Sequence, residues 1–275
     1  MTTASINTRP AARDFSPAIG VSTAAFYPTH ATEDALILAG ELGFPVVEVF
    51  LQALEEYSPA FGRELDRRRR DAGVRVHSLH LHVHYCALWS PYARARRETR
   101  DRFVQVVETA ARLEARAITW HGIRYGFGNP ALMQDFFESA LWAAEQAHAA
   151  GVTLCVENVS WCYLRAPKHV VTLRELGAPL GFVFDSFQAA EAGVSAAEMI
   201  RAMDGGLKTV HLSDYAPGGP RHLPLGEGVI DWAEVFAALR AINYSGPLLI
   251  ELAHVTEMET LRASREFLQR KLWLS

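Results

Sequence analysis

Four side chains that can bind a metal ion stand at the ends of apolar runs in the second half of the chain. The runs read VTLCVE, GFVFD, LKTVH and PLLIE, and they end at Glu157, Asp185, His211 and Glu251. Each run has the composition of a buried β-strand that a charged or imidazole group interrupts at its carboxyl end. The four residues are separated by 28, 26 and 40 positions, and one strand–helix unit takes roughly 30 residues or more. The sequence therefore predicts that they lie at the same end of successive strands in one parallel sheet.

Three carboxylates and one imidazole that converge in this way would form a mainly oxygen site for a divalent cation. This donor set suits Mn²⁺, with Mg²⁺, Co²⁺ or Zn²⁺ as alternatives. A single glutamate or histidine at a strand end is more often a helix cap, a salt-bridge partner or a packed polar group. The recurrence of such residues at consecutive strand ends favours one shared metal site.

The rest of the chain alternates between strand and helix patterns, with no linker between them. The expected strands are Ile19–Phe26, Val46–Leu51, Val74–His82, Ala117–Gly122, Val152–Asn158, Gly181–Asp185, Leu207–Asp214 and Pro247–Leu252. The expected helices are Thr32–Leu42, Phe61–Ala72, Ser90–Leu113, Asn129–Ala150, Ala166–Leu176, Ala196–Met203, Trp232–Ile242 and Thr256–Leu272. Such alternation implies parallel strands, and eight units in one chain favour a closed barrel. We therefore predict an α/β fold, a single-domain (β/α)8 TIM barrel over residues 18–275, preceded by a polar tail over residues 1–17.

Composition limits the classes of function. The chain has 275 residues, a net charge of −4 and three cysteines, so it has no overall basic field for nucleic acid and no disulfide framework. No apolar run approaches the roughly 18 residues of a membrane span. These features predict a cytoplasmic enzyme with neither nucleic acid nor a membrane as a partner. No glycine-rich fingerprint follows the first strand, which counts against a dinucleotide fold.

Several other side chains are candidates for contact with a substrate. His80, His82 and His84 alternate, and we expect a pocket role for His82 only. Glu48, near the end of its strand, is expected to bind a substrate hydroxyl or to form a structural salt bridge. Trp161 could stack on a ring of the substrate or simply pack.

The motifs that carry these residues resemble the xylose-isomerase-like TIM-barrel superfamily from about Ile19 onward. The resemblance rests on ENV after the fifth strand, the Asp that ends the sixth, HLSD at the seventh, PLGEGVIDW in the next loop and IEL at the eighth. Members include sugar-phosphate and ketose isomerases and epimerases, inosose dehydratases and apurinic-site endonucleases. The resemblance implies one divalent metal on Glu157, Asp185, His211 and Glu251, and it matches His121 to the His-Gly pair of the family.

For an isomerase or epimerase of a small sugar, sugar phosphate or polyol, the resemblance also implies a mechanism. The metal stabilises an enediolate when an α-proton leaves. Glu157 and Glu251 act as the general base and acid. Arg221 and His222 would hold substrate hydroxyls or phosphate, although a surface-loop pair is an equal alternative. Family members often form dimers or tetramers, so a homo-oligomer is among the expected partners.

The chain departs from the family pattern at two places. Gln188 stands where many epimerases carry histidine; glutamine can hydrogen-bond a hydroxyl but cannot serve as an acid or base near neutral pH. Pro220 stands where the endonucleases need an aspartate ligand, so loss of both residues disfavours phosphodiester hydrolysis on DNA. A metal-dependent dehydratase of a cyclic polyol begins with the same proton abstraction and stays the main alternative. A non-catalytic binding protein on a barrel scaffold is the other.

Overall fold

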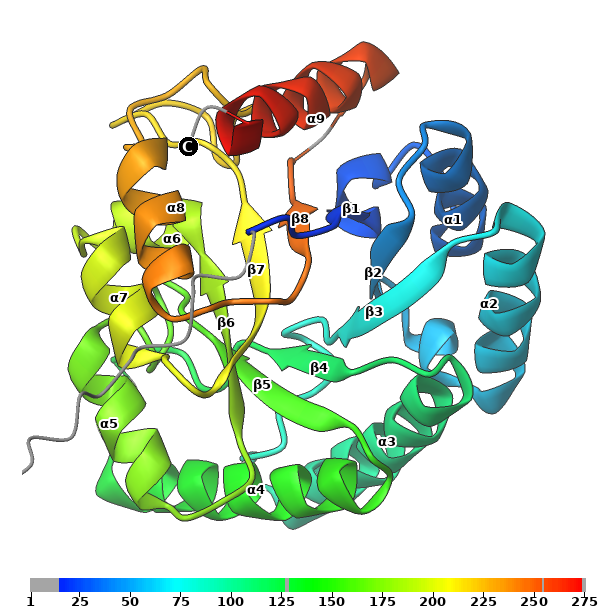
Figure 1. Cartoon of the computed structure of the whole chain (residues 1–275). Coiled ribbons are helices and arrows are strands. Elements are labelled where there is room, and N and C mark those ends of the chain that lie inside the picture. Colours follow the sequence, from blue (N-terminus) through cyan, green and yellow to red (C-terminus); the bar gives the residue numbers. More distant parts are fainter. Residues whose placement is uncertain (1–14, 127–128, 254, 274–275) are drawn as a thin grey trace, which may run out of the picture.

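Eight parallel strands close into a barrel in sequence order, with the helices outside (Figure 1). The computed structural model describes residues 15–126, 129–253 and 255–273. The strands are β1 Ile19–Ser22, β2 Val46–Phe50, β3 Arg75–His80, β4 Ala117–Trp120, β5 Thr153–Glu157, β6 Gly181–Asp185, β7 Leu207–Leu212 and β8 Leu248–Ile250. Pairing of β1 with both β2 and β8 closes the ring. The predicted single-domain TIM barrel is confirmed.

The helices follow the strands as expected, with a few differences at their ends. They are α1 Thr32–Glu41, α2 Pro59–Ala72, α3 Ala93–Arg112, α4 Pro130–Ala149, α5 Pro167–Glu175, α6 Ser186–Glu191, α7 Ala196–Ala202, α8 Trp232–Ala241 and α9 Met258–Trp273. Short 3-10 helices cover Thr23–Phe26 and Leu54–Tyr57. The predicted first strand was therefore too long, because the Ser22 side chain accepts a hydrogen bond from the Ala24 amide and starts a helical turn.

Helix α6 was not predicted. It begins directly after β6 because the Asp185 side chain caps it, accepting a hydrogen bond of 2.7 Å from the Gln188 amide. The predicted third strand also ended too late, since β3 stops at His80. Both differences fall at the carboxyl ends of strands, where the candidate site lies.

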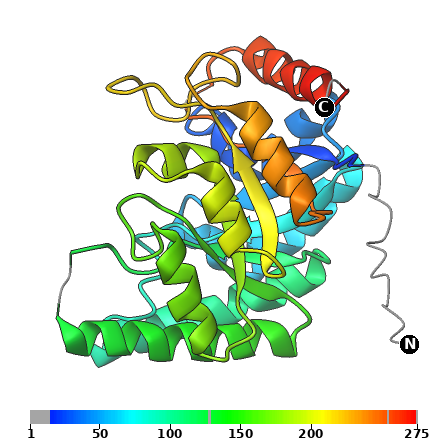
Figure 2. The ribbon, with the colours of Figure 1, turned by 60° about the vertical axis from the view of Figure 1, so that its left-hand side comes forward.

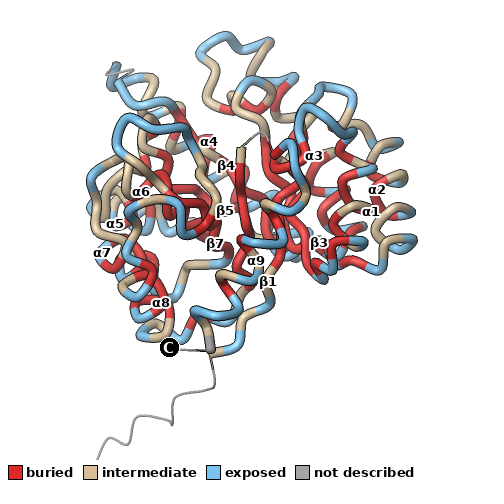
Figure 3. The backbone as a smooth tube through the Cα atoms, turned by 90° about the horizontal axis from the view of Figure 1, so that it is seen from above, coloured by how far each residue is buried: buried red, intermediate tan, exposed pale blue. Residues whose placement is uncertain are grey.

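The hydrophobic core occupies the space between the barrel and the inner faces of its helices (Figure 3). Phe136 on α4 is an example: it is fully buried, and its ring lies 5.5 Å from that of Trp120 on β4. Removal of such a ring leaves a cavity and costs about 3–5 kcal/mol of stability. This packing fixes each strand relative to its helix and so fixes the direction of the side chains at the strand ends.

The polar run Arg67–Arg70 on α2 lies on the outside of the barrel. Its arginines form ion pairs within the helix, with partners that include Glu64, Asp66 and Asp71. The run is a charged helix face rather than a binding patch. The predicted tail, residues 1–17, falls mostly outside the described residues. Phe15, which is described, packs against the core. Figure 2, turned from the view of Figure 1, also shows the helices on the outside of the strands.

Candidate metal centre

Four strand ends bring together the residues predicted to bind a metal. Glu157 ends β5, Asp185 ends β6, His211 lies on β7 and Glu251 follows β8. One ligand atom from each of the four lies within 4.8 Å of the ligand atoms of the other three. All four residues are at least nine-tenths buried. The carboxyl end of the barrel, called the mouth below, can therefore enclose one ion.

His211 is the centre of this cluster. Its Nδ1 lies 2.9 Å from Glu157 Oε1 and 2.7 Å from Glu251 Oε2. Its Nε2 lies 3.1 Å from the carboxylate of Glu48. The imidazole therefore presents Nδ1 to the carboxylates at the mouth and Nε2 to a carboxylate deeper in the barrel.

Glu48 lies inside the barrel and is completely buried. It accepts hydrogen bonds from the hydroxyls of Ser22, Ser78 and Thr119 at 3.2, 2.8 and 3.0 Å, in addition to its contact with His211. The contact with His211 matches the structural alternative that we gave for Glu48, and binding of a substrate hydroxyl stays a prediction. A carboxylate on the far nitrogen of a metal-binding histidine fixes the tautomer and the ring orientation. Glu48 is placed to accept the Nε2 proton of His211, which directs Nδ1 toward the carboxylates of the cluster.

The donor atoms of the cluster are short of hydrogen-bond partners. Asp185 Oδ1 caps α6, but its Oδ2 is buried without a partner among the described residues. Glu251 Oε2 is also buried and makes no hydrogen bond of good geometry there, although it lies 2.7 Å from His211 Nδ1. Buried carboxylate oxygens without partners are unfavourable. These residues fit a divalent cation, which would satisfy both oxygens.

The charges of the cluster point to the same conclusion. Burial acts to raise the pKa of Glu157, yet the charge and hydrogen bond of His211 hold that pKa well below its usual value. Burial acts to lower the pKa of His211, but Glu48, Glu251 and Glu157 raise it well above the ordinary value. The pKa of Asp185 is raised well above normal by burial and then by the charges of Glu157 and Glu251. The carboxylates of Glu157 and Glu251 oppose ionisation of Asp185, so a bound cation would favour its charged form.

Two more histidines surround Glu157. His80 Nε2 and His121 Nε2 lie 3.2 and 3.0 Å from Glu157 Oε2, and 3.2 Å from each other. These three residues form a second group whose ligand atoms lie within metal-binding distance, and His80 is fully buried. No role was predicted for His80. The available signal was the alternation of inward-facing side chains along β3, on which His80 follows the inward Ser78.

His82, which we expected in the pocket, lies beyond the end of β3. Its amide donates to the Tyr57 hydroxyl at 2.8 Å, and its ring lies 5.0 Å from that of His84 and 5.1 Å from that of Tyr85. Because the strand stops at His80, the alternation does not continue through His82 and His84. The structure brings His80, rather than His82, to the carboxylates.

The remaining predicted residues lie around the mouth. The Trp161 ring meets the His121 ring edge-on at 5.6 Å. Gln188 is buried, and its Oε1 accepts hydrogen bonds of 3.0 Å from the Ser160 amide and hydroxyl. That contact fixes the orientation of the Gln188 amide, assigned by its partners.

Arg221 and His222 both lie against the ring of Phe187 on α6. Arg221 pairs with Glu191 at 2.5 Å, and its guanidinium carbon lies 4.7 Å from the centre of the Phe187 ring. The His222 ring stacks on Phe187 at 4.4 Å, and His222 Nδ1 lies 2.9 Å from Ser213 Oγ. The loop pair is thus anchored to α6 and to Ser213, which follows β7.

The motif residues next to the ligands have structural roles. Asn158 exchanges hydrogen bonds of 3.0 and 2.8 Å with the backbone of Asp185 and so joins the ends of β5 and β6. Asp214 accepts from the amides of Gly226 and Ile230 and from the Trp232 indole, at 2.9 to 3.1 Å. Asp214 therefore organises the PLGEG loop and is not a ligand.

A closed barrel whose carboxyl end gathers carboxylates and imidazoles is a TIM barrel with a candidate divalent-metal centre. The chain belongs to the xylose isomerase-like TIM barrel family, whose model matches residues 36–271. The resemblance noted from the motifs is confirmed.

Known proteins resemble the chain over most of its length. It is 27% identical over 259 residues to the putative L-ribulose-5-phosphate 3-epimerase SgbU of Escherichia coli K12, covering 88% of this chain and 89% of that protein. It is 26% identical to the L-ribulose-5-phosphate 3-epimerase UlaE of Escherichia coli O157:H7, covering 80% of this chain and 81% of that protein.

Solved structures share the fold. A D-tagatose 3-epimerase-like protein superposes with a TM-score of 0.79 at 22% identity, covering 93% of this chain and 97% of the other. D-psicose 3-epimerase with D-tagatose from Clostridium cellulolyticum H10 gives 0.77 at 19% identity, covering 92% and 98%. Within the described part of the chain, no helix has both the length and the apolar character that a membrane span requires.

Proposed function

We propose that this protein is a divalent-metal-dependent 3-epimerase of a small ketose or ketose phosphate. The observation that carries the proposal is the pair of carboxylates, Glu157 and Glu251, that approach the same nitrogen of His211 from β5 and β8 at 2.9 and 2.7 Å. An epimerase needs two such groups, one to take a proton from carbon and one to return it. The names of the similar L-ribulose-5-phosphate 3-epimerases support this assignment.

In this mechanism Glu157, Asp185, His211 and Glu251 would hold the cation. When bound, the cation supplies the positive charge that stabilises negative charge on the substrate oxygens. The depressed pKa of Glu157 keeps that carboxylate ionised near neutral pH, as a base must be. We assign proton removal and return to Glu157 and Glu251 as a pair, because each comes from a different side of the mouth. Delivery of the proton from the opposite side inverts the carbon.

Other side chains would position the substrate. His121 and Trp161 line the mouth beside Glu157, so they are placed to hydrogen-bond and to stack on a sugar. Gln188 replaces the imidazole found in many epimerases, so it supplies hydrogen bonds but no proton transfer. Arg221 and His222 are proposed to contact substrate from their position on Phe187.

Mn²⁺ is the ion that we propose, because three of the four ligands are carboxylates. All three cysteines are free and buried, which fits the reducing cytoplasm that we infer. A homo-oligomer stays a prediction.

Solvent isotope exchange tests the proposal. The Mn²⁺-loaded protein is incubated in D₂O with L-ribulose, D-psicose, D-tagatose and L-ribulose 5-phosphate, and the products are identified by NMR and mass. We expect deuterium at the inverted carbon of at least one substrate, and loss of exchange in Glu157→Gln and Glu251→Gln. A product that has lost water would instead identify the dehydratase, and no exchange with any of the four would contradict the proposal.

A further inference from the structure

Two arginines on the rim of the candidate metal centre have no acidic partner among the described residues. Arg124 lies in the loop after β4 and Arg165 in the loop after β5, so both stand at the carboxyl end of the barrel. By contrast, Arg221, in the loop after β7, is paired with Glu191 at 2.5 Å. Their positive charge is therefore available to an anionic ligand.

The loops that carry Arg124 and Arg165 are fastened to each other. Arg124 and Cys162 form an antiparallel β-bridge. The Tyr125 amide donates to the Trp161 carbonyl at 2.8 Å, and the Tyr163 amide donates to the Ile123 carbonyl at 2.8 Å. The two loops thus act as one short ribbon with a fixed backbone.

Aromatic rings orient both guanidinium groups. The Arg165 guanidinium carbon lies 3.4 Å from the centre of the Tyr125 ring, and that of Arg124 lies 5.8 Å from the centre of the Trp161 ring. A guanidinium that stacks on a ring keeps its N–H groups free in the plane. This arrangement suits two parallel hydrogen bonds to a phosphate or carboxylate.

The ribbon leads directly to the reacting carboxylate. The Trp161 ring lies 5.6 Å from the His121 ring, and His121 Nε2 lies 3.0 Å from Glu157 Oε2. Arg124 is therefore three side-chain contacts from Glu157. A group at the end of a sugar chain remote from the carbonyl would fall here while the carbonyl end faces Glu157.

We propose that Arg124, supported by Arg165, binds the terminal phosphate of a sugar-phosphate substrate. This inference rests on the proposed function and narrows it, because it selects the phosphorylated ketose over the free sugar. The phosphate sits on the ribbon of the β4 and β5 loops, and the metal centre holds the opposite end of the molecule.

Steady-state kinetics on a ketose and its 5-phosphate test the inference. We expect the wild-type protein to use the 5-phosphate with the higher kcat/KM. Arg124→Ala lowers kcat/KM for the 5-phosphate by roughly 10- to 100-fold, mostly through KM, because a charge-assisted hydrogen bond is lost. The same variant changes kcat/KM for the free ketose by less than about twofold, and Arg124→Lys keeps part of the preference.

The matched control is Arg116→Ala. Arg116 precedes β4 at the opposite end of the barrel, is exposed and has no ion-pair partner among the described residues, so its removal should leave both substrates unaffected. Inorganic phosphate should inhibit turnover of the free ketose competitively, and more weakly in Arg124→Ala.

The same assay distinguishes failure of the phosphate subsite from failure of the proposed function. Equal use of ketose and 5-phosphate, unchanged in Arg124→Ala, overturns the phosphate subsite and leaves the epimerase intact. Absence of solvent exchange from both substrates refutes the proposed function, and the subsite with it.

Discussion

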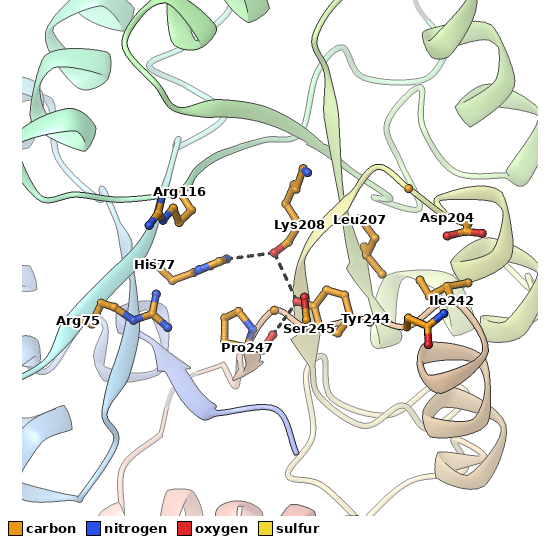
Figure 4. A pocket seen from close by; sticks show the side chains of 13 residues that line it. Arg75, His77, Arg116, Asp204, Leu207, Lys208, Ile242, Tyr244, Ser245 and Pro247 are labelled. Carbon is orange, nitrogen blue, oxygen red and sulfur yellow. Dashed lines mark hydrogen bonds between the residues drawn. The ribbon is translucent and has the colours of Figure 1, made fainter. Parts of the chain in front are cut away.

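The two ends of the barrel differ in whether their charged side chains are buried or exposed. At the carboxyl end, carboxylates and imidazoles are buried against each other. At the amino end, Arg75, Arg116 and Lys208 are exposed around a hollow of about 390 Å³ (Figure 4). Burial of charge is costly unless it is paired, whereas exposed cations keep their water. The unfavourable arrangement therefore occurs at the end where the chemistry is expected.

Two histidines show the contrast most directly. His77, buried at the amino end, lies 3.1 Å from the Lys208 carbonyl and 3.2 Å from Thr209 Oγ1. Burial, with the nearby Arg75 charge, lowers its pKa to about 4 despite the hydrogen bond to Lys208. His211 is equally enclosed, but its carboxylate neighbours raise its pKa well above normal. The same residue type is a packing group at one end and the centre of a carboxylate cluster at the other.

The largest effect should follow a change at the carboxyl end. Glu157→Gln keeps the shape of the side chain but cannot accept a proton, so we expect kcat to fall by about 10²- to 10⁴-fold. Rates of deuterium exchange measure this loss, with Glu251→Gln as the companion variant. A Glu157→Gln protein within tenfold of wild type would show that the pair does not carry out the proton transfers.

The Glu48→Gln variant tests the contrast between the two ends through metal affinity rather than through reaction rate. Glutamine retains the volume but not the charge that orients His211, so metal affinity should fall roughly 10- to 100-fold. Titration against a fluorescent chelator measures the change. His77→Gln at the amino end is the matched control. If both variants bind metal like the wild type, then Glu48 does not act through His211.

Asp185→Asn should stabilise the metal-free protein. Asp185 has a folded-state pKa above its unfolded value, so its favourable contribution is complete below the unfolded pKa of about 3.9 and is lost as pH rises toward the folded pKa. The asparagine avoids that loss, and Tm should exceed that of wild type near pH 7 by about 2–4 °C per kcal/mol gained. Thermal melts in chelator at pH 4 and pH 7 check this, and a difference that does not grow with pH contradicts it.

The smallest effect should come from the amino end. Arg75→Ala removes an exposed side chain without an ion-pair partner among the described residues, so stability should change by less than about 0.5 kcal/mol. Urea denaturation and metal titration serve as the measurements. A large loss of metal affinity in Arg75→Ala would contradict the claim that metal binding depends on the carboxyl end alone.

Much of the barrel follows from local pattern, because each buried strand is a short apolar run between helix signals. The convergence of Glu157, Asp185, His211 and Glu251 follows too, since parallel strands end at one edge. The inward positions of His80 and Glu48, however, cannot be predicted from the local sequence pattern. A shift in the pairing of β2 with β3, between Val47 and Glu48, decides which side chains face inward, and a one-residue change in register reverses every side chain.

The division of roles between the two oxygens of Asp185 could not be predicted from the sequence either. Its Oδ1 caps α6 while Oδ2 has no partner among the described residues. Local sequence favours a cap or a ligand as alternatives, whereas the structure shows that one carboxylate can serve both. That division depends on the direction in which the chain leaves β6, which no local pattern specifies.

Metal content is the most direct test of the account. We would measure it by mass spectrometry on protein incubated with Mn²⁺ and passed through a desalting column, with wild type beside His211→Ala. We predict one ion per chain in the wild type and none in the variant, with the fold retained by circular dichroism. No ion in the wild type, or full retention of the ion in His211→Ala, would contradict the claim that these four strand ends form a metal centre.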